Sequence, residues 1–144
     1  MFATVAIATD GSASVERAAA MGIDLAARFD AQLVGISVID TREIETAPAH
    51  LQDELEGALT ARATAALDTL AAMAAAPIER VIERGRPAPT VIAAAEGIGA
   101  ELLVVGTRGR HGENRMLLGS VAEQLVRTAP MPVCTVRQLE GAHG

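Results

Sequence analysis

The chain of 144 residues has the length of one domain and leaves little room for a second. Its formal net charge of -6 disfavours a protein that coats nucleic acid, and its twelve basic residues are all Arg, which excludes mechanisms that need a Schiff-base lysine or a Walker P-loop lysine. Because its one cysteine permits no internal disulfide and no segment is apolar for long enough to span a bilayer, we expect a cytoplasmic protein without membrane insertion.

The first half of the chain predicts two buried strands joined by a helix, followed by a longer helix. Apolar runs over 2–9 (FATVAIAT) and 32–39 (QLVGISVI) are typical of strands, and the segment 14–29 between them repeats apolar residues at helical spacing. A polar stretch then runs from Asp40 through Pro48. From Leu51 to Met73 an apolar stripe indicates a long helix, which Pro77 stops.

The second half predicts three further strands and two helices. The strand over 78–83 is interrupted by charged residues, which favours a sheet edge. Pro87 introduces a helix over 88–97 that Gly97 ends, and a strand over 102–105, a helix over 120–128 and a strand over 132–137 follow. We therefore predict an α/β fold with a doubly wound parallel sheet of five strands, order 3-2-1-4-5, and helices on both faces. One domain over 1–139 and a frayed tail over 140–144 are expected.

Three segments should converge on the edge where open parallel sheets bind ligands, outside the carboxyl ends of the strands. They are Thr9 to Ser12 after the first strand, Val38 to Asp40 ending the second, and the loop from Gly106 to Ser120 after the fourth. In that loop, Gly106 and Gly109 precede nine residues and then Gly119-Ser120, which opens a helix. Glycine-bearing loops and helix amino ends present N–H groups to phosphate, so the loop is a candidate phosphate site.

A plainer interpretation of the same residues remains open. Ser120 and Glu123 have the spacing of a capping box, in which their side chains satisfy backbone donors at a helix start. Gly106 and Gly109 would then serve only to turn the chain. The position of the loop, after a strand and before a helix on the ligand-binding edge, favours phosphate binding.

The residues GTRGRHGENRMLLGS, from Gly106 to Ser120, resemble the glycine signature of the nucleotide-binding branch of the universal stress protein family. The resemblance extends over nearly the whole chain, including TDGS (9–12), SVID (37–40), LLVVG (102–106) and PVCTVR (132–137). It implies an ATP-binding protein that acts as a nucleotide-dependent regulatory or interaction module in the stress response. It also implies a homodimer that pairs through the final strand, Pro132 to Arg137.

The resemblance carries over to individual positions of this sequence. It implies that Asp10 lies near the ribose and that Val38 offers backbone groups to the adenine edge, and Thr9 beside Asp10 is a further candidate nucleotide-binding residue. The implied phosphate-binding residues are the following: Gly106, Gly109, Gly119, Ser120 and Val121. Arg108 in the same loop is a candidate from its charge, which could offset that of a triphosphate, with a solvated loop charge as the alternative.

Other polar residues give weaker signals. Asp10 and Asp40 are candidate carboxylates for a Mg²⁺ ion that accompanies the nucleotide, although a strand-end aspartate such as Asp40 equally often caps a turn. His50 has no neighbour of metal-ligand type, and Cys134 in an apolar strand is expected to be an inert thiol.

Two classes of function therefore compete. The first is a binding module whose ATP occupancy alters what the protein contacts, and the second is an enzyme related to ATP pyrophosphatases or adenylating enzymes. The enzymes need an SGGxDS-like loop after the first strand, where this chain has DGSASVE (10–16). No nucleophile and base stand at a suitable spacing, so we expect no catalytic residues, with slow ATP hydrolysis and a cyclic nucleotide ligand as the alternatives.

Overall fold

The computed structural model describes residues 3–107 and 119–137. Its five strands form one parallel sheet of order β3-β2-β1-β4-β5, as predicted. The strands are β1 (Thr4–Ala8), β2 (Gln32–Asp40), β3 (Glu79–Gly85), β4 (Leu102–Gly106) and β5 (Val133–Val136). Connections through helices between parallel strands produce this order. The expected tail over 140–144 lies outside the described residues, and the single-domain assignment remains a prediction.

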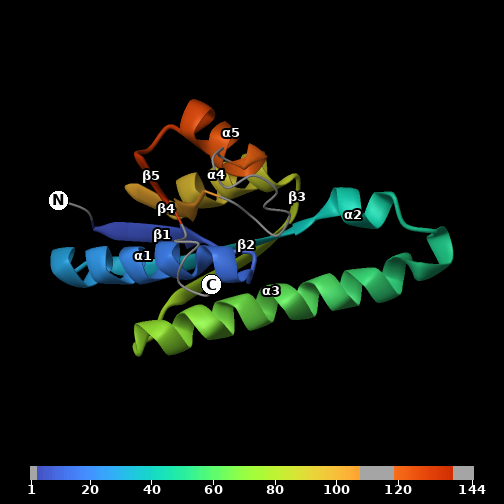
Figure 1. Cartoon of the computed structure of the whole chain (residues 1–144), viewed down its shortest axis with the longest axis horizontal. Coiled ribbons are helices and arrows are strands. Elements are labelled where there is room, and N and C mark those ends of the chain that lie inside the picture. The colour runs from blue at the N-terminus through green and yellow to red at the C-terminus, as the bar shows by residue number, and fades with distance from the viewer. Residues whose placement is uncertain (1–2, 108–118, 138–144) are drawn as a thin grey trace.

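Helices cover both faces of the sheet (Figure 1). They are α1 (Glu16–Phe29), α2 (Thr41–Glu45), α3 (Gln52–Ala74), α4 (Pro87–Gly97) and α5 (Ser120–Thr128), with the 3-10 turns η1 (Ala13–Val15) and η2 (Ala49–Leu51). Buried residues of α1 and α3 pack with Val5 and Ile7 of β1 on one face. Buried residues of α4 and α5 pack with Ala6 on the other face. Successive residues of a strand point to opposite faces, so a strand that is apolar throughout serves both cores.

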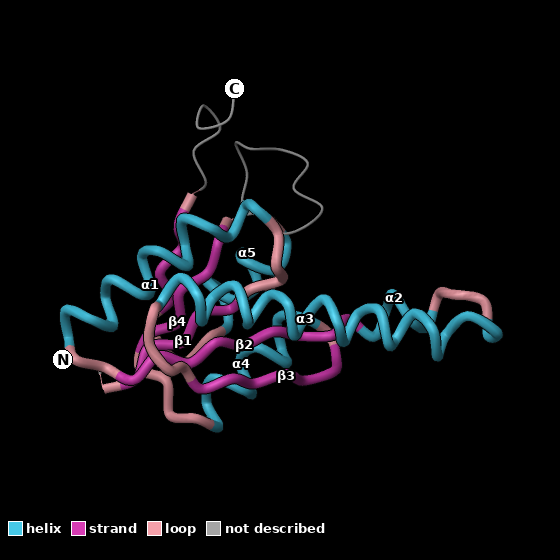
Figure 2. The backbone as a smooth tube through the Cα atoms, turned by 90° about the horizontal axis from the view of Figure 1, so that it is seen from below, coloured by secondary structure: helices cyan, strands magenta, loops and turns pink. Residues whose placement is uncertain are grey.

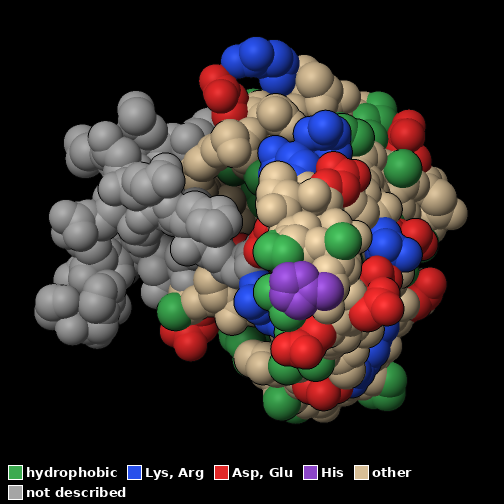
Figure 3. All heavy atoms as spheres, turned by 90° about the vertical axis from the view of Figure 1, so that its right-hand side faces the viewer, with side chains coloured by type: hydrophobic (Ala, Val, Ile, Leu, Met, Phe, Trp, Pro, Cys, Tyr) green, Lys and Arg blue, Asp and Glu red, His purple; other side chains and the backbone are tan. Residues whose placement is uncertain are grey.

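The longest helix, α3, extends beyond the sheet, and α2 lies near its projecting end (Figures 1 and 2). A third, smaller apolar cluster joins these two helices to the end of β2, through Ile39, Ile44, Leu59 and Ala63. Side chains on the face formed by this end of the molecule are mixed, with acidic groups among hydrophobic and basic ones (Figure 3). The apolar cluster thus packs α2 and the first half of α3 against the end of β2.

The segment after β2 differs from the prediction. The polar stretch 41–48 was expected to contain no element, but residues Thr41–Glu45 form α2. The Asp40 side chain starts this helix because its carboxylate accepts a hydrogen bond from the backbone N–H of Arg42 at 3.0 Å. Ile44 is the one buried residue of α2, so the segment lacks the apolar period by which helices are recognised.

Smaller differences concern the ends of elements. Helix α1 begins at Glu16, after a 3-10 turn, rather than at residue 14. Helix α4 begins at Pro87 itself, and the left-handed glycine after it is Gly99, with φ of 71°, whereas Gly97 is still helical. Strand β3 is exposed at Arg80, Glu83 and most of its other residues, which confirms the expected sheet edge.

Among the helices of residues 3–107 and 119–137, none is both long enough and apolar enough to cross a membrane.

Candidate functional site

The strands that lead into the three predicted segments end on the same side of the sheet. Strand β1 is hydrogen-bonded between β2 and β4, and all of these strands are parallel. Their carboxyl ends, which lead into Thr9-Asp10, Asp40 and Gly106, therefore point the same way. Neighbouring strands are about 4.8 Å apart, so the ends of β2 and β4 are separated by about 10 Å across β1.

A tight turn fixes the segment after β1. The hydroxyl oxygen of Thr9 accepts a hydrogen bond from the Gly11 N–H at 3.1 Å, and the carboxylate of Asp10 accepts one from the Ser12 N–H at 2.9 Å. Gly11 has φ of 82°, a conformation that L side chains rarely adopt. A Cβ placed on Gly11 would lie 3.2 Å from the Cβ of Ala66, so the turn is packed closely against α3. The half-buried Asp10 is thereby held at the edge of the sheet.

Strand β2 continues past the last residue of β1 that pairs with it. Backbone groups at the end of β2 therefore point to a side on which no strand pairs with them. The Thr9 N–H donates to the carbonyl of Ile36 at 2.9 Å, so the polar groups of Ile36 face β1. Alternate residues of a parallel strand face the same neighbour, and Val38 is two residues further on. The N–H and C=O of Val38 therefore point to the side of β2 where the chain of β1 has turned away. Meanwhile β2 continues to pair with β3 as far as Asp40.

Asp40 has a structural role at the end of β2. In addition to capping α2, its carboxylate forms an ion pair with the Arg42 guanidinium at 2.8 Å. The hydrogen bond to Asp40 and its negative charge raise the pKa of Arg42 above its ordinary value. Of the two predicted roles of Asp40, the capping role is the one confirmed.

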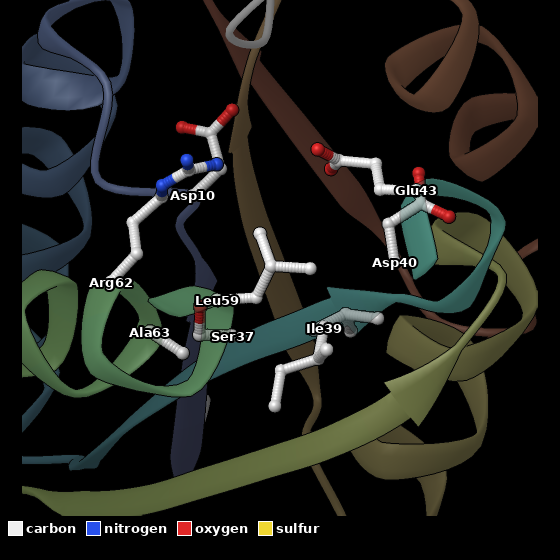
Figure 4. A pocket seen from close by; sticks show the side chains of 9 residues that line it. Asp10, Ser37, Ile39, Asp40, Glu43, Leu59, Arg62 and Ala63 are labelled. Atoms are coloured by element: carbon white, nitrogen blue, oxygen red, sulfur yellow. The ribbon is translucent and has the colours of Figure 1, made fainter. Parts of the chain in front are cut away.

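A pocket opens between the end of β1, the end of β2 and helix α3 (Figure 4). It holds about 270 Å³ of space that includes its opening to solvent. Its polar lining consists of Asp10, Ser37, Asp40, Glu43 and Arg62. Its apolar lining consists of Val38, Ile39, Leu59 and Ala63. The pocket thus combines an apolar wall with several carboxylates, which can accept hydrogen bonds from a ligand.

The structure therefore brings the predicted residues Asp10 and Val38 into one pocket and adds Arg62 and Glu43, which sequence reasoning missed. Arg62 lies on the exposed side of a long helix, where an arginine is usually a solvated charge. Glu43 belongs to the short helix that was not predicted. Neither residue has a local sequence signal for a ligand site, because only the packing of α2 and α3 places them there.

Thr107 and Gly119, the described residues between β4 and α5, lie next to the end of β4, on the other side of β1 from β2. The Gly119 N–H donates to the carbonyl of Thr107 at 2.5 Å, so the chain returns next to the end of β4 before α5 begins. Gly119 is the N-cap of α5, Ser120 is its first residue, and Val121 is half-buried on the α4 and α5 face. Arg108 and Gly109 lie outside the described residues.

The capping-box interpretation of Ser120 and Glu123 is wrong. It requires Ser120 to be the N-cap, but that position belongs to Gly119, whose carbonyl accepts the Glu123 N–H at 2.9 Å. The carboxylate of Glu123 pairs instead with Arg127, one turn further along, at 2.9 Å. The amino end of α5 thus begins with backbone N–H groups that precede the first intrahelical hydrogen bond.

Opposite chemistries therefore flank the end of β1. Carboxylates and the Val38 backbone on the α3 side suit a part of a ligand that donates hydrogen bonds, whereas the amino end of α5 suits an anionic part. Within the described part of the chain, no three His, Cys, Asp or Glu side chains gather as a metal site. A nucleotide-bound Mg²⁺ needs only one or two protein carboxylates, so Asp10 alone is compatible with the predicted metal role.

His50 and Cys134 are not brought together. His50 is exposed in η2, beyond α2, whereas Cys134 is a half-buried residue of β5, at the far side of the sheet from β2. These positions agree with a histidine that has no metal-ligand neighbour and lies on the surface, and with a thiol that lies within an apolar strand.

Comparisons with known proteins match this chain to one family over nearly its whole length. The model of the universal stress protein family matches residues 1–137. A universal stress protein of Thermus aquaticus is 37% identical over 142 residues, covering 95% of this chain and 100% of the relative. The structure of hypothetical protein MJ0577 covers 97% of this chain and 99% of its own with a TM-score of 0.86 and 24% identity, a likeness of fold.

A universal stress protein solved in complex with cAMP is also similar. It has a TM-score of 0.71 and 27% identity, covering 96% of this chain and 99% of that one. The sheet order, the glycine segment before α5 and these matches lead to one conclusion: the chain belongs to the universal stress protein family.

Proposed function

We propose that this chain binds an adenine nucleotide, ATP with Mg²⁺, across the carboxyl end of β1 and acts as a nucleotide-dependent regulatory module in the stress response. The observation that carries the proposal is the pairing of two chemistries on either side of β1. Carboxylates at the ends of β1 and β2 and in α2 line the pocket together with the Arg62 guanidinium of α3, and donor groups begin α5 next to β4. A nucleotide has the matching polarity, with a base and sugar that donate hydrogen bonds and phosphates that accept them.

The nucleoside half is assigned to the pocket of Figure 4. Asp10 is placed to accept from the ribose hydroxyls, because its turn holds the carboxylate at the mouth of the pocket. We propose that Val38 pairs with the edge of the base through its N–H and C=O, which lie on the side of β2 where β1 has ended. Leu59 and Ile39 supply apolar surface beneath.

The phosphate half is assigned to the glycine segment. Gly106 ends β4 and Gly119 precedes α5, and the hydrogen bond from Gly119 to Thr107 brings these two ends together. The backbone amides of Ser120 and Val121, with the Ser120 hydroxyl, are the proposed donors. Gly109 and Arg108 complete the proposal from the sequence signature, and Asp10 is the proposed carboxylate for Mg²⁺.

Binding rather than turnover is proposed as the main role. The separated positions of His50 and Cys134 support this, since a nucleophile and its base must lie within hydrogen-bond reach. The proposed setting is the cytoplasm, where a chain with one cysteine suits the reducing conditions. The proposed output is a contact with a regulated protein, made by a homodimer that pairs through β5.

A cyclic nucleotide is the second candidate ligand. The similar structure that contains cAMP favours it, because that protein is 27% identical to this chain. Both candidates share the adenosine group and differ in the number of phosphates. The glycine segment, with Gly106, Gly109 and Gly119-Ser120, favours the longer phosphate chain.

The ligand can be identified directly. Protein purified without added nucleotide is denatured, and the released small molecules are separated and identified by mass spectrometry. Affinities for ATP, AMP and cAMP are then measured by calorimetry on nucleotide-free protein. Release of ATP, or tighter binding of ATP than of cAMP, supports the proposal. Failure of all three to bind contradicts it.

A substitution tests whether the glycine segment is the phosphate site. Gly119 has φ of -65°, which any residue adopts, so Gly119→Val adds atoms beside the phosphate without straining the backbone. We expect ATP affinity to fall by about tenfold or more, because one lost charge-assisted hydrogen bond costs about 1.5–3 kcal/mol. Gly57→Val is the matched control, since Gly57 is exposed on α3 with open space around it. Equal ATP affinity of both variants would place the phosphates elsewhere.

A further inference from the structure

The pocket toward α3 lacks the side chains that usually contact the face of a planar base. The chain contains no Trp or Tyr, and its two Phe residues are Phe2 and Phe29. Phe29 ends α1, which runs from the carboxyl ends of the strands back to their amino ends. Phe2 lies outside the described residues. The pocket lining contains no aromatic side chain. The face of a base bound there would therefore contact aliphatic and charged side chains of the lining.

Arg62 is the cationic residue of this lining, and its guanidinium is a delocalised planar group. Its place beside the Asp10 turn is set by packing, because a Cβ on Gly11 would lie 3.9 Å from the carbonyl oxygen of Arg62. Its side chain extends toward Asp10, on the side of the pocket across from Asp40 and Glu43 (Figure 4). Helix α3 thus presents a guanidinium at the mouth of the pocket, above the apolar side chain of Leu59.

The position of Arg62 separates it from the glycine segment. Helices α3 and α1 cover one face of the sheet, whereas α5 lies on the other face with α4. In the order of strands, α3 borders the end of β2, and the glycine segment follows β4 on the far side of β1. Arg62 therefore faces the nucleoside half of the proposed ligand rather than its phosphates.

We propose that Arg62 is a specificity-determining residue whose guanidinium plane lies against the face of the bound base. This inference rests on the proposed function and deepens it. Guanidinium planes stack on nucleic-acid bases, and an arginine is attracted to a π-face in a way that a compact ammonium group matches less well.

The test compares two variants and two ligands. Arg62→Ala removes the plane and the charge, whereas Arg62→Lys keeps only the charge. Affinities for ATP and for inorganic triphosphate are measured by calorimetry, with triphosphate also measured by competition against ATP. We expect Arg62→Ala to weaken ATP by about tenfold and Arg62→Lys by about threefold, with triphosphate unchanged in both.

The matched control is Arg28→Ala, which removes an equal charge from an exposed ion pair on α1 with Asp24. It should leave both ligands unaffected. Wild-type affinity of Arg62→Lys for ATP, or an equal loss of ATP and triphosphate in Arg62→Ala, overturns the role of the plane. If wild-type protein binds no adenine nucleotide, the proposed function itself fails. If wild-type protein binds ATP and Arg62→Ala binds it equally well, only the assignment of Arg62 fails.

Discussion

Two buried glycines set how closely the helices approach the sheet. A Cβ on Gly22 of α1 would lie 2.5 Å from two side-chain carbons of Ile7 on β1. A Cβ on Gly35 of β2 would lie 2.7 Å from Leu70 and 2.8 Å from Leu67, both on α3. These side chains are themselves buried, so they have little room to move. Because Gly22 and Gly35 have no Cβ, α1 and α3 can pack closely against the strands.

We expect Gly22→Ala and Gly35→Ala each to lower the free energy of unfolding by about 1–3 kcal/mol, the usual cost of overpacking. Gly57→Ala is the control on an exposed face of α3, where a new Cβ meets nothing within 4 Å. It should raise that free energy by about 0.5–1 kcal/mol, because alanine is the better helix former. Urea denaturation followed by circular dichroism gives all three values. Stability of Gly22→Ala equal to wild type would show that Ile7 relaxes freely.

At the scale of elements, α2 depends on its first side chain. Asp40→Ala removes the acceptor for the Arg42 N–H, and we expect the free energy of unfolding to fall by about 1 kcal/mol. Asp40→Asn should retain most of that stability, because asparagine also caps helices and the exposed Arg42 gains little from its ion pair. Urea denaturation again supplies the measurement. An equal loss in both variants would mean that the charge, rather than the cap, stabilises α2.

The same element shows what the sequence could and could not predict. All five strands and the helices α1, α3, α4 and α5 were predicted. Their apolar residues occur in continuous runs or at helical spacing, because these residues form the buried faces. Helix α2 buries only Ile44 and so leaves no period. In the candidate site, Asp10, Val38 and Gly119 were predicted from their positions at strand and helix ends together with the family resemblance, and their roles stay predictions. Arg62 was missed because its place in the pocket depends on the close approach of α3 to Gly11.

At the scale of the whole molecule, the two edges of the sheet differ. Strand β3 is charged along its length, and its arginines Arg80 and Arg84 pair with Asp68 and Glu56 of α3. Strand β5 has the uncharged sequence VCTV and is half-buried in most of its residues. Charged edges resist pairing with another chain and uncharged edges permit it. The proposed dimer therefore uses β5.

A proline in β5 tests that dimer. The carbonyls of Pro132 and Val136 accept hydrogen bonds from the β4 side, so the intervening Thr135 directs its N–H to the open edge. Thr135→Pro removes that donor, and prolines are tolerated on edge strands. We expect sedimentation analysis to show a monomer, whereas Thr135→Val, which keeps the N–H, stays dimeric. A dimeric proline variant with native circular dichroism would place the contact elsewhere.

The unequal edges also limit how far such an assembly can grow. Two copies joined by their β5 strands about a two-fold axis would form one continuous ten-stranded array whose outer boundaries are both β3. Each boundary carries charges that belong to ion pairs within its own subunit, and a third copy would have to break them. In the proposed dimer, association would thus stop after one step, and the strand that lies farthest from the partner would prevent growth into fibres.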